Sequence, residues 1–515
     1  AAVNHKGSPT VILAKTVKGY GMGDAGESEN TTHQVKKVGI DDLKQFRERF
    51  DLPIPDRTLS LVPYYQPPLG SKEMSYIRQV RKRLGGYIPR RVEAKPGFDI
   101  PGLEMFQRQL EGTAKRETST TSVFVNLLQT LCRNKELRDY VVPIIPDEAR
   151  TFGMEGMFKQ LGIYSSEGQL YTPEDEGGLS AYRESKDGQV LEEGINEAGA
   201  FSAWLAAATS YSSHRFTLIP FYIFYSMFGF QRVGDLAWAA GDMQARGFLL
   251  GATAGRTTLN GEGLQHQDGH SHLLSSAIPN CVSYDPCFAY ELAVIIHRGL
   301  QRMYVDDERV FYYITLMNER YTHPPMPEGV EDQILQGMYK FQTFGNATRT
   351  SGRVVHLLGS GTIFREVLKA AEMLSENYDV TSHVWSVTSF SELAREGADT
   401  DRWNTLHPDE PARISYVGSH LSGTQPVIAA TDYLKVHAGS IQGYIDAPYR
   451  VLGTDGFGRS DTRENLRRHF EVDSKHIAVS ALKSLADAQV LPYTLVKDAI
   501  EEMRIDQDKP EPRSL

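Results

Sequence analysis

Cysteine, positive charge and long apolar runs are all scarce in this 515-residue chain. Three cysteines occur, at spacings that suit neither a disulfide framework nor a zinc ribbon: Cys132, Cys281 and Cys287. A reducing cytoplasm is therefore the expected location. The 55 Lys and Arg are outnumbered by 65 Asp and Glu, which gives a net charge of −10. Because a protein that grips a phosphate backbone needs a basic face, nucleic acid is not an expected partner.

No apolar run is long enough for a membrane span. The most apolar stretches, 201–208 and 218–230, are broken by polar residues, Pro or Gly well short of the ~20 residues required. The chain starts without Met or a signal peptide, and Ala1–Pro9 leads directly into Val11–Thr16, which is typical of a buried strand. We expect the chain to begin inside a domain, either as a fragment or because the preceding part is disordered, cleaved or carried on another chain.

The first region combines short elements with polar and proline-rich stretches. After the strand Val11–Thr16 come a glycine-rich loop at 19–26, a polar stretch and an amphipathic helix. That helix begins at Asp41 or Asp42, either of which is a plausible N-cap. The proline-rich run that follows, and the basic stretch Arg78–Arg91, predict a linker that crosses the surface.

Helical stretches alternate with short apolar runs through the rest of the chain, which predicts parallel sheets with helices on both faces. From about 118 to 321 the predicted elements are the helix Ser119–Leu131 and the strands Val141–Ile145, Thr217–Phe224, Cys281–Tyr284 and Val310–Thr315. From about 352 they are the strands Val354–Leu358, His383–Val387 and Tyr449–Gly453, the helix Phe364–Asn377 and terminal helices to Met503. Ligands of such sheets lie beyond the carboxyl ends of the strands, so the loops there are the places to expect chemistry.

Two of these loops carry candidate acids. Asp147 and Glu148 directly follow a predicted strand, where burying an unpaired carboxylate for packing alone is costly. The alternative is that Asp147 is a helix N-cap. Glu197 begins a helix of small residues, where it either serves the chemistry or complements the helix dipole.

Two further loops carry aromatic rings and histidines. The aromatic run 220–232 begins as a strand and turns at Gly229, and it predicts either core or a stacking wall for a flat heteroaromatic ring. The segment 255–272 carries four potential metal ligands: His266, Asp268, His270 and His272. Its glycines argue against a helix that presents two histidines on one face, and no other ligand set is near. Neutral histidines that donate and accept substrate protons are the expected use, and we expect no metal site.

Four runs together resemble one enzyme family: Lys18-Gly-Tyr-Gly-Met-Gly-Asp24, Asp147-Glu-Ala-Arg-Thr-Phe-Gly153, Glu193-Gly-Ile-Asn-Glu197 and Gly261-Glu-Gly-Leu-Gln-His266. The family is that of the homodimeric bacterial decarboxylating components of 2-oxo acid dehydrogenase complexes, and the pyruvate-specific members are the most similar. The resemblance extends from the first predicted strand to Arg513. Transketolases share the fold but resemble this chain only in general pattern.

The resemblance implies the fold and the domains. It implies a thiamine-diphosphate-binding α/β fold, a parallel sheet with helices on both faces, plus a transketolase-type C-terminal α/β domain. The expected domains are the end of the diphosphate-binding domain with a linker (1–96), the pyrimidine-binding domain (97–326) and the C-terminal domain (327–515). We expect the last to support the dimer and the wall of the active site.

The resemblance also implies the reaction. It is the decarboxylation of pyruvate with thiamine diphosphate and Mg²⁺, followed by reductive acetylation of the lipoyl group of a partner dihydrolipoyl acetyltransferase. Family members hold the magnesium with a Gly-Asp-Gly run followed by Asn, and this sequence contains no Gly-Asp-Gly. We expect those ligands upstream of Ala1 and the chain to be inactive alone, since the two halves of each site come from different subunits of the homodimer.

Positions that match the family's motifs receive roles by resemblance. The glutamate that hydrogen-bonds the pyrimidine ring matches Glu197, and the histidine that faces the substrate carbonyl matches His266. A third candidate for proton traffic is Glu148. The expected cofactor-binding set is Glu197, Asp147, Tyr225, Phe228, Arg232, Lys18 and Glu262.

The polar stretch Gly23–Gly39 is predicted to be mobile when the site is empty and to close when it is full. By resemblance, His33 assists acetyl transfer to the lipoyl group, while Lys36 and Lys37 help to receive the lipoyl domain. Without the resemblance, a solvated loop with an idle histidine is the default. The alternatives for the whole chain are a transketolase, another 2-oxo acid decarboxylating component, or a non-catalytic assembly fragment.

Overall fold

The structure, a computed structural model, describes residues 1–87, 96–146, 149–173, 182–346 and 352–515. The chain divides into two compact units, Ala1–Arg91 and Val92–Leu515. Among the described residues, no helix combines the length and the apolar character needed to cross a membrane.

The smaller unit is built from short helices and loops. Its α-helices are α1 (Ile40–Arg49), α2 (Asp56–Leu59) and α3 (Lys72–Arg83), and its 3-10 turns are η1 (Ala2–Asn4), η2 (Gly23–Ala25) and η3 (Thr32–Gln34). The predicted buried strand Val11–Thr16 is wrong, because this segment is exposed and forms no strand. The described part of the unit contains no strand with which it could pair, so its backbone groups have no ladder to join.

Two other predictions for this unit need correction. The first helix starts at Ile40 with Gly39 as its N-cap, and the Asp42 carboxylate accepts a hydrogen bond from the Gly39 amide at 3.2 Å. Asp42 therefore acts from the third helical position instead of capping the helix itself. The stretch predicted as a linker contains α2 and α3. The basic residues from Arg78 to Arg83 lie on α3, which Ser71 caps by accepting a hydrogen bond from the Met74 amide.

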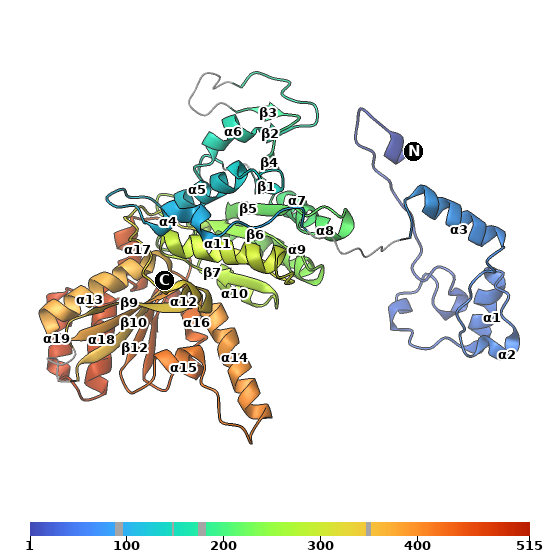
Figure 1. The fold of residues 1–515 in the computed structure, drawn as a ribbon. Coiled ribbons are helices and arrows are strands. Elements are labelled where there is room, and N and C mark those ends of the chain that lie inside the picture. The colour runs from blue at the N-terminus through green and yellow to red at the C-terminus, as the bar shows by residue number, and fades with distance from the viewer. Residues whose placement is uncertain (88–95, 147–148, 174–181, 347–351) are drawn as a thin grey trace. The chain divides into compact units, whose positions relative to one another are not determined.

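The larger unit contains two α/β lobes, each built on one sheet (Figure 1). The sheet of the first lobe has six strands, and every described pairing in it is parallel. The strand order is β4-β1-β5-β6-β8-β7. The strands are β1 (Val141–Ile145), β4 (Leu191–Glu192), β5 (Ile219–Tyr225), β6 (Phe248–Ala252), β7 (Cys281–Tyr284) and β8 (Phe311–Thr315).

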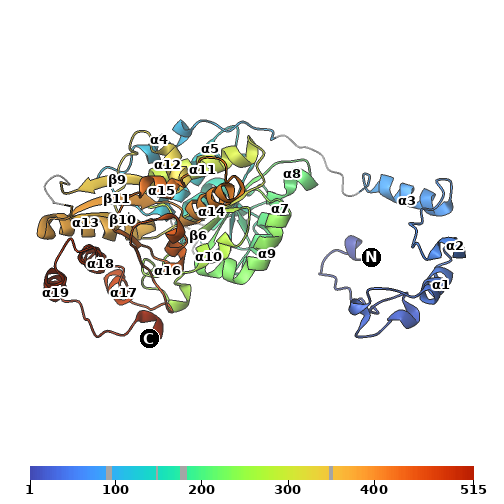
Figure 2. The same ribbon diagram turned by 90° about the horizontal axis from the view of Figure 1, so that it is seen from below.

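Helices cover both faces of this sheet, as Figures 1 and 2 show. The covering helices are α5 (Thr120–Arg133) and α11 (Ala289–Tyr304) on one face, with α7 (Glu197–Ala208), α9 (Phe230–Asp242) and α10 (Ser271–Ser276) on the other. Successive residues of β5 point to opposite faces, so Phe221 packs with the α5 and α11 side while Tyr222 packs with α7 and α9. Because both faces are buried, the strand shows no alternation of polar and apolar residues.

The second lobe carries a five-stranded sheet in the order β13-β12-β10-β11-β9, and among its described pairings only that of β9 is antiparallel. Its strands are β9 (Met338–Phe344), β10 (Val354–Gly359), β11 (Thr381–Val387), β12 (Val427–Ala430) and β13 (Tyr449–Leu452). Its helices are α13 (Phe364–Tyr378), α14 (Phe390–Leu406), α15 (Tyr416–His420), α16 (Lys435–Gly439), α17 (Arg463–Phe470), α18 (Ser474–Asp487) and α19 (Tyr493–Glu502).

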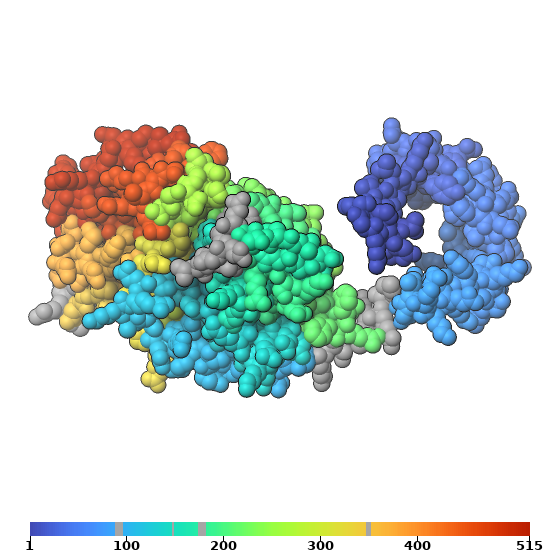
Figure 3. All heavy atoms as spheres, turned by 90° about the horizontal axis from the view of Figure 1, so that it is seen from above, coloured from blue at the N-terminus to red at the C-terminus, as the bar shows by residue number. Residues whose placement is uncertain are grey.

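The remaining α-helices and strands described in the larger unit are short: α4 (Gln107–Leu110), α6 (Glu155–Leu161), α8 (Ser210–Ser213), α12 (Glu331–Gln336), β2 (Ile163–Tyr164) and β3 (Glu184–Ser185). One apolar core runs through both lobes and includes residues of both sheets. In Figure 3 the orange and red residues of the second lobe pack against the yellow-green part of the first. The two lobes are therefore joined by one continuous hydrophobic core.

Candidate active site

Four of the predicted site segments begin where neighbouring strands of the first sheet end. The strands are β4, β1, β5 and β6, which are consecutive in the sheet. Parallel strands end at the same edge, so the loops that follow them are brought together there. Asp147 and Glu148, which follow β1, lie outside the described residues.

Glu197 is the first residue of α7, which Asn196 caps by accepting a hydrogen bond from the Gly199 amide at 3.0 Å. Its side chain is only 13% exposed. Oε1 of Glu197 accepts a hydrogen bond from Nη1 of Arg232 at 2.8 Å, and the Arg232 guanidinium lies 4.1 Å from the centre of the Phe228 ring. The predicted acid is thus shielded from water and joined through arginine to the predicted aromatic wall.

The aromatic wall continues from Phe228 to His266. The rings of Tyr225 and Phe228 meet edge to face at 5.8 Å, and the imidazole of His266 lies 5.0 Å from each of them. The ring of Phe152 also packs edge to face against Tyr225, with ring centres 5.5 Å apart. Nδ1 of His266 is buried and has no hydrogen-bond partner among the described residues. A buried donor or acceptor without a partner is costly, so this nitrogen is suited to a ligand.

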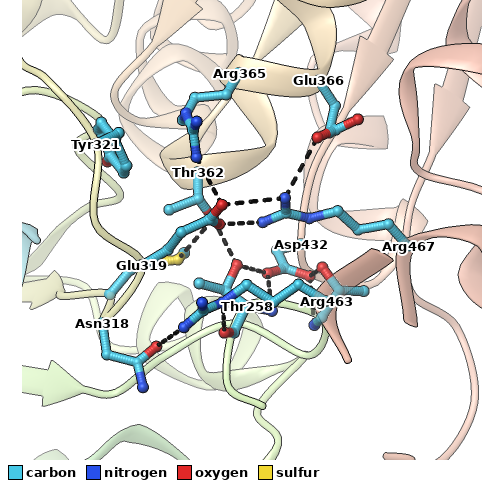
Figure 4. A network of polar contacts seen from close by, with 12 residues as sticks. Thr258, Asn318, Glu319, Tyr321, Thr362, Arg365, Glu366, Asp432, Arg463 and Arg467 are labelled. Atoms are coloured by element: carbon cyan, nitrogen blue, oxygen red, sulfur yellow. Dashed lines mark hydrogen bonds and ion pairs between the residues drawn. The ribbon is translucent and has the colours of Figure 1, made fainter. Parts of the chain in front are cut away.

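The loop that carries His266 is fastened to the second lobe by Asp432, which follows β12. The Asp432 carboxylate is fully buried and accepts hydrogen bonds from the amides and hydroxyls of Thr257 and Thr258, at 2.5 to 3.1 Å (Figure 4). Burial raises its pKa, while the two threonine hydroxyls oppose that shift. A Cβ at Gly255, whose φ is +91°, would collide with this carboxylate. Asp432 thus fixes the start of the loop.

Residues 453–460 of the second lobe form a wall beside the same loop. Arg256 donates hydrogen bonds to the carbonyls of Thr454, at 2.8 Å, and Gly456. The Ser460 hydroxyl donates to the backbone carbonyl of Glu262 at 2.9 Å, which is the contact that the structure gives this predicted site residue. This wall therefore encloses the histidine loop from the side of the second lobe.

The other polar residues of the predicted histidine segment have separate partners. Asp268 accepts hydrogen bonds from the amides of His270 and Ser271, and His270 contacts Gln231 at 2.7 Å. His272 is buried against His437, with ring centres 5.0 Å apart, and burial lowers its pKa. Within the described ranges, no group of three or more metal-ligating side chains is gathered.

A second buried carboxylate, Asp285, lies where the two lobes meet, directly after β7. Its Oδ1 accepts hydrogen bonds from the hydroxyls of Thr315, at 2.7 Å, and Tyr433, at 3.3 Å. Its Oδ2 has no partner among the described residues, and burial raises the pKa of this carboxyl to about 7. Neither Asp285 nor Asp432 was predicted from the sequence to belong to the site.

In the smaller unit, Lys18 and His33 come together, with Nζ of Lys18 3.1 Å from Nδ1 of His33. The glycine-rich loop between them is tied to α1, because the Glu27 carboxylate accepts hydrogen bonds from the amides of Gly21 and Gly23 and from Arg49. The Arg49 guanidinium holds the pKa of Glu27 below its usual value. His33 itself is exposed. The predicted mobility of this stretch stays a prediction.

Two family matches cover most of the larger unit. Residues 98–324 match the family described as pyruvate dehydrogenase E1 component middle domain, and residues 337–473 match that described as transketolase-like TK C-terminal domain. The pyruvate dehydrogenase E1 component of Cupriavidus necator is 55% identical over 517 residues, which cover 100% of this chain. The chain belongs to the pyruvate dehydrogenase E1 component family. Thiamine diphosphate is the cofactor of this enzyme family.

Further E1 components match over nearly the whole chain. That of Escherichia coli (strain K12) is 54% identical over 514 residues, and that of Pseudomonas aeruginosa is 54% identical over 513 residues, each covering 99% of this chain. The chain spans about 58% of the length of these E1 relatives. The predicted family is confirmed.

The E1 fold is also that of transketolase. The structure of transketolase from Campylobacter jejuni superposes with a TM-score of 0.59 at 15% identity, covering 92% of this chain and 62% of that chain. That from Leishmania mexicana gives a TM-score of 0.52 at 16% identity, covering 93% and 57%. Such likeness shows the fold alone, and it confirms the predicted α/β fold class with a transketolase-like C-terminal domain.

Proposed function

We propose that this chain supplies the pyrimidine-binding half of the active site of a thiamine-diphosphate-dependent enzyme that decarboxylates pyruvate. The acetyl group passes to the lipoyl group of a partner dihydrolipoyl acetyltransferase. The observation that supports this most is the continuous line from the shielded carboxylate of Glu197, through Arg232 and Phe228, to the unpartnered nitrogen of His266.

These residues fit an aminopyrimidine ring. A carboxylate next to flat aromatic rings can hydrogen-bond a ring nitrogen while the rings exclude water. When bound, thiamine diphosphate supplies the electron sink that loss of carbon dioxide from a 2-oxo acid requires. Glu197 then holds and orients the ring, Tyr225 and Phe228 shield it, and Nδ1 of His266 can exchange a proton with a polar ligand.

The remaining assignments belong to the same proposal. Asp147, Glu148 and Glu262 line the substrate cavity, and Lys18 contacts the cofactor. His33 serves acetyl transfer, with Lys36 and Lys37 at the approach of the lipoyl domain. We also propose the three domains 1–96, 97–326 and 327–515, a homodimer and, since all three cysteines are free thiols, a cytoplasmic location.

Binding of magnesium and the diphosphate is expected to require a Gly-Asp-Gly run, and this sequence contains none. We therefore propose that the 515-residue chain alone does not turn over pyruvate. The test is to add a polypeptide of an E1 relative that carries that run, with thiamine diphosphate and Mg²⁺, and to measure release of carbon dioxide. Pyruvate-dependent release supports the proposal, whereas association of the two polypeptides without turnover supports the assembly fragment.

The choice of substrate separates the remaining alternatives. The reconstituted enzyme is expected to prefer pyruvate over 2-oxoglutarate and 2-oxoisovalerate and to leave sugar phosphates unchanged. Preference for another 2-oxo acid would make the chain a different decarboxylating component. Transfer of a two-carbon unit between sugar phosphates would make it a transketolase.

A further inference from the structure

A large polar cavity of about 980 Å³ is lined mostly by the second lobe, and its lining residue Arg463 contacts the backbone of Thr258 at the start of the histidine loop. It is lined by most of α17, by the first turn of α18 and by the segment that follows α19, together with Glu319, Glu366 and Lys369. Seven Lys or Arg side chains and two His side chains line it, against six Asp or Glu. None of the predicted site residues is among them.

Arg467 and the carboxylates that it contacts form one side of the cavity lining. The buried guanidinium of Arg467 forms ion pairs with Glu319 and, at 3.3 Å, with Glu366 (Figure 4). These two carboxylates are shared with two further cations, Arg365 at 2.6 Å and Lys369 at 2.8 Å. Three cations, of which Arg365 lies outside the cavity lining, thus share two carboxylates.

Arg463 is a further cation of the cavity lining. It donates hydrogen bonds to neutral acceptors, the Thr258 carbonyl at 2.7 Å and the Asn318 amide oxygen at 3.1 Å. Burial and the neighbouring Arg467 and Arg365 lower its pKa, although Glu319 opposes the shift. Neither of these two hydrogen bonds of Arg463 is made to a carboxylate.

Two nitrogen atoms in the cavity wall lack hydrogen-bond partners among the described residues. Nε of Arg467 and Nε2 of His469 are buried and have no hydrogen-bond partner among the described residues. Arg467 is only 5% exposed, and both residues line the cavity. A guanidinium edge that is buried without an acceptor favours an oxygen-rich anion.

Three further cations of the lining are Lys475, Arg468 and Arg504, and two further carboxylates are Glu464 and Asp506. Lys475 donates to the Met503 carbonyl at 3.1 Å and Arg468 donates to the Asn465 amide oxygen at 2.8 Å, so neither is neutralised by a carboxylate in these bonds. Arg504 is exposed beside them.

Two carboxylates of the lining are occupied by their own helices. Asp461 accepts hydrogen bonds from Thr462 and Asn465, and Asp473 accepts from the amide and ring of His476. These carboxylates also attract the neighbouring cations Arg468 and Lys475, and the lining as a whole keeps a small excess of positive charge, seven Lys or Arg against six Asp or Glu.

We propose that this cavity binds a small anion that carries two or more linked phosphate groups. Guanidinium groups match phosphate oxygens in charge and geometry, and the first turns of α17 and α18 add backbone dipoles that favour an anion. The cavity lies within the ~300–1,000 Å³ typical of sites for small molecules. The ligand is either an inorganic oligophosphate or the phosphate end of a nucleotide, which share this chemistry.

The test is calorimetric titration of the 515-residue chain with inorganic pyrophosphate, and separately with ADP, at constant ionic strength and without Mg²⁺. Saturable binding at one site is expected. ADP binding at least about tenfold tighter than pyrophosphate identifies a nucleotide, and equal or weaker ADP binding identifies an oligophosphate.

Exposed residues of the cavity make the test specific. The double change Lys475→Gln with Arg504→Gln should weaken pyrophosphate binding about tenfold or more without lowering the unfolding temperature. The matched control is Lys497→Gln, an exposed lysine of α19 that pairs with Glu501 and does not line the cavity. Absence of saturable binding to the wild-type chain overturns the proposal, as does equal affinity in the cavity variant and the control.

Discussion

Nη1 of Arg232 donates a hydrogen bond to Oε1 of Glu197 at 2.8 Å, so the carboxylate assigned to the aminopyrimidine is held by an ion pair. The same arginine lies over the ring of Phe228. Arg232 is half exposed, whereas Glu197 is shielded. The pair therefore fixes the carboxylate at the edge of the aromatic wall and can open toward a ligand that hydrogen-bonds the other oxygen.

The first prediction concerns Glu197. Glu197→Gln keeps the shape of the side chain but removes its charge and its ability to take a proton. In the reconstituted enzyme, pyruvate-dependent release of carbon dioxide should fall about 100-fold or more. Hydrogen-deuterium exchange at the acidic carbon of bound thiamine diphosphate should slow as well. The control is Glu193→Gln, which changes an exposed glutamate in the same loop. Unchanged exchange in Glu197→Gln would remove the assigned role.

The second prediction separates the two half-reactions. His33→Ala should lower acetyl transfer to a lipoyl domain by roughly tenfold or more and leave decarboxylation with an artificial electron acceptor within about twofold. Lys18→Met should share part of the transfer defect, because its Nζ lies 3.1 Å from the imidazole. His5→Ala, an exposed histidine in the same unit, is the control. A parallel loss of both half-reactions would contradict the assignment.

The third prediction concerns the seam between the lobes. Asp432→Ala should destabilise the larger unit by about 3 kcal/mol or more, because it leaves buried donors of Thr257 and Thr258 without an acceptor. Urea unfolding measures the change. Asp409→Ala, at an exposed position, should cost less than about 0.5 kcal/mol. Similar midpoints for the two variants would mean that the carboxylate contributes little to stability.

The fourth prediction is a pH dependence. Burial raises the pKa of Asp285 to about 7, above its unfolded value, so the folded state holds this proton more tightly than the unfolded state does. Its contribution to stability is full below the unfolded pKa and is lost as the pH rises through about 7.

The Asp285→Asn variant resembles the protonated acid and lacks this dependence. The free energy of unfolding of the wild type should therefore fall relative to that of the variant between pH 5 and pH 8, by a few kcal/mol (about 1.4 per unit of pKa shift). Urea titrations at several pH values measure the difference. A difference that stays constant with pH would contradict the prediction.

Much of the larger unit was predictable because its strands are short apolar runs between helices. Val141–Ile145 and Cys281–Tyr284 are strands with the predicted bounds. β6 and β12 were missed, since small residues such as Gly251 and Ala429 weaken their signal. Val11–Thr16 shows the opposite error, because an apolar run does not reveal whether a partner strand is available.

The site was predictable where chemistry follows the sequence locally. Glu197 heads its helix as predicted, and Tyr225, Phe228 and His266 gather as a wall. Their roles in catalysis stay predictions. The anchoring of the histidine loop was not predictable, because Asp432 and its partner Thr257 are 175 residues apart and neither belongs to a motif.

The contact between Asp432 and the two threonines also bears on how E1 enzymes can be recombined. A chimera joined between the lobes would combine a loop from one parent with a carboxylate from another, and any mismatch would be buried. Exchanging residues 253–270 together with 427–460 keeps both sides of that contact from one parent. Laboratory shuffling of these enzymes should therefore yield active hybrids mainly when the two segments are inherited as a pair.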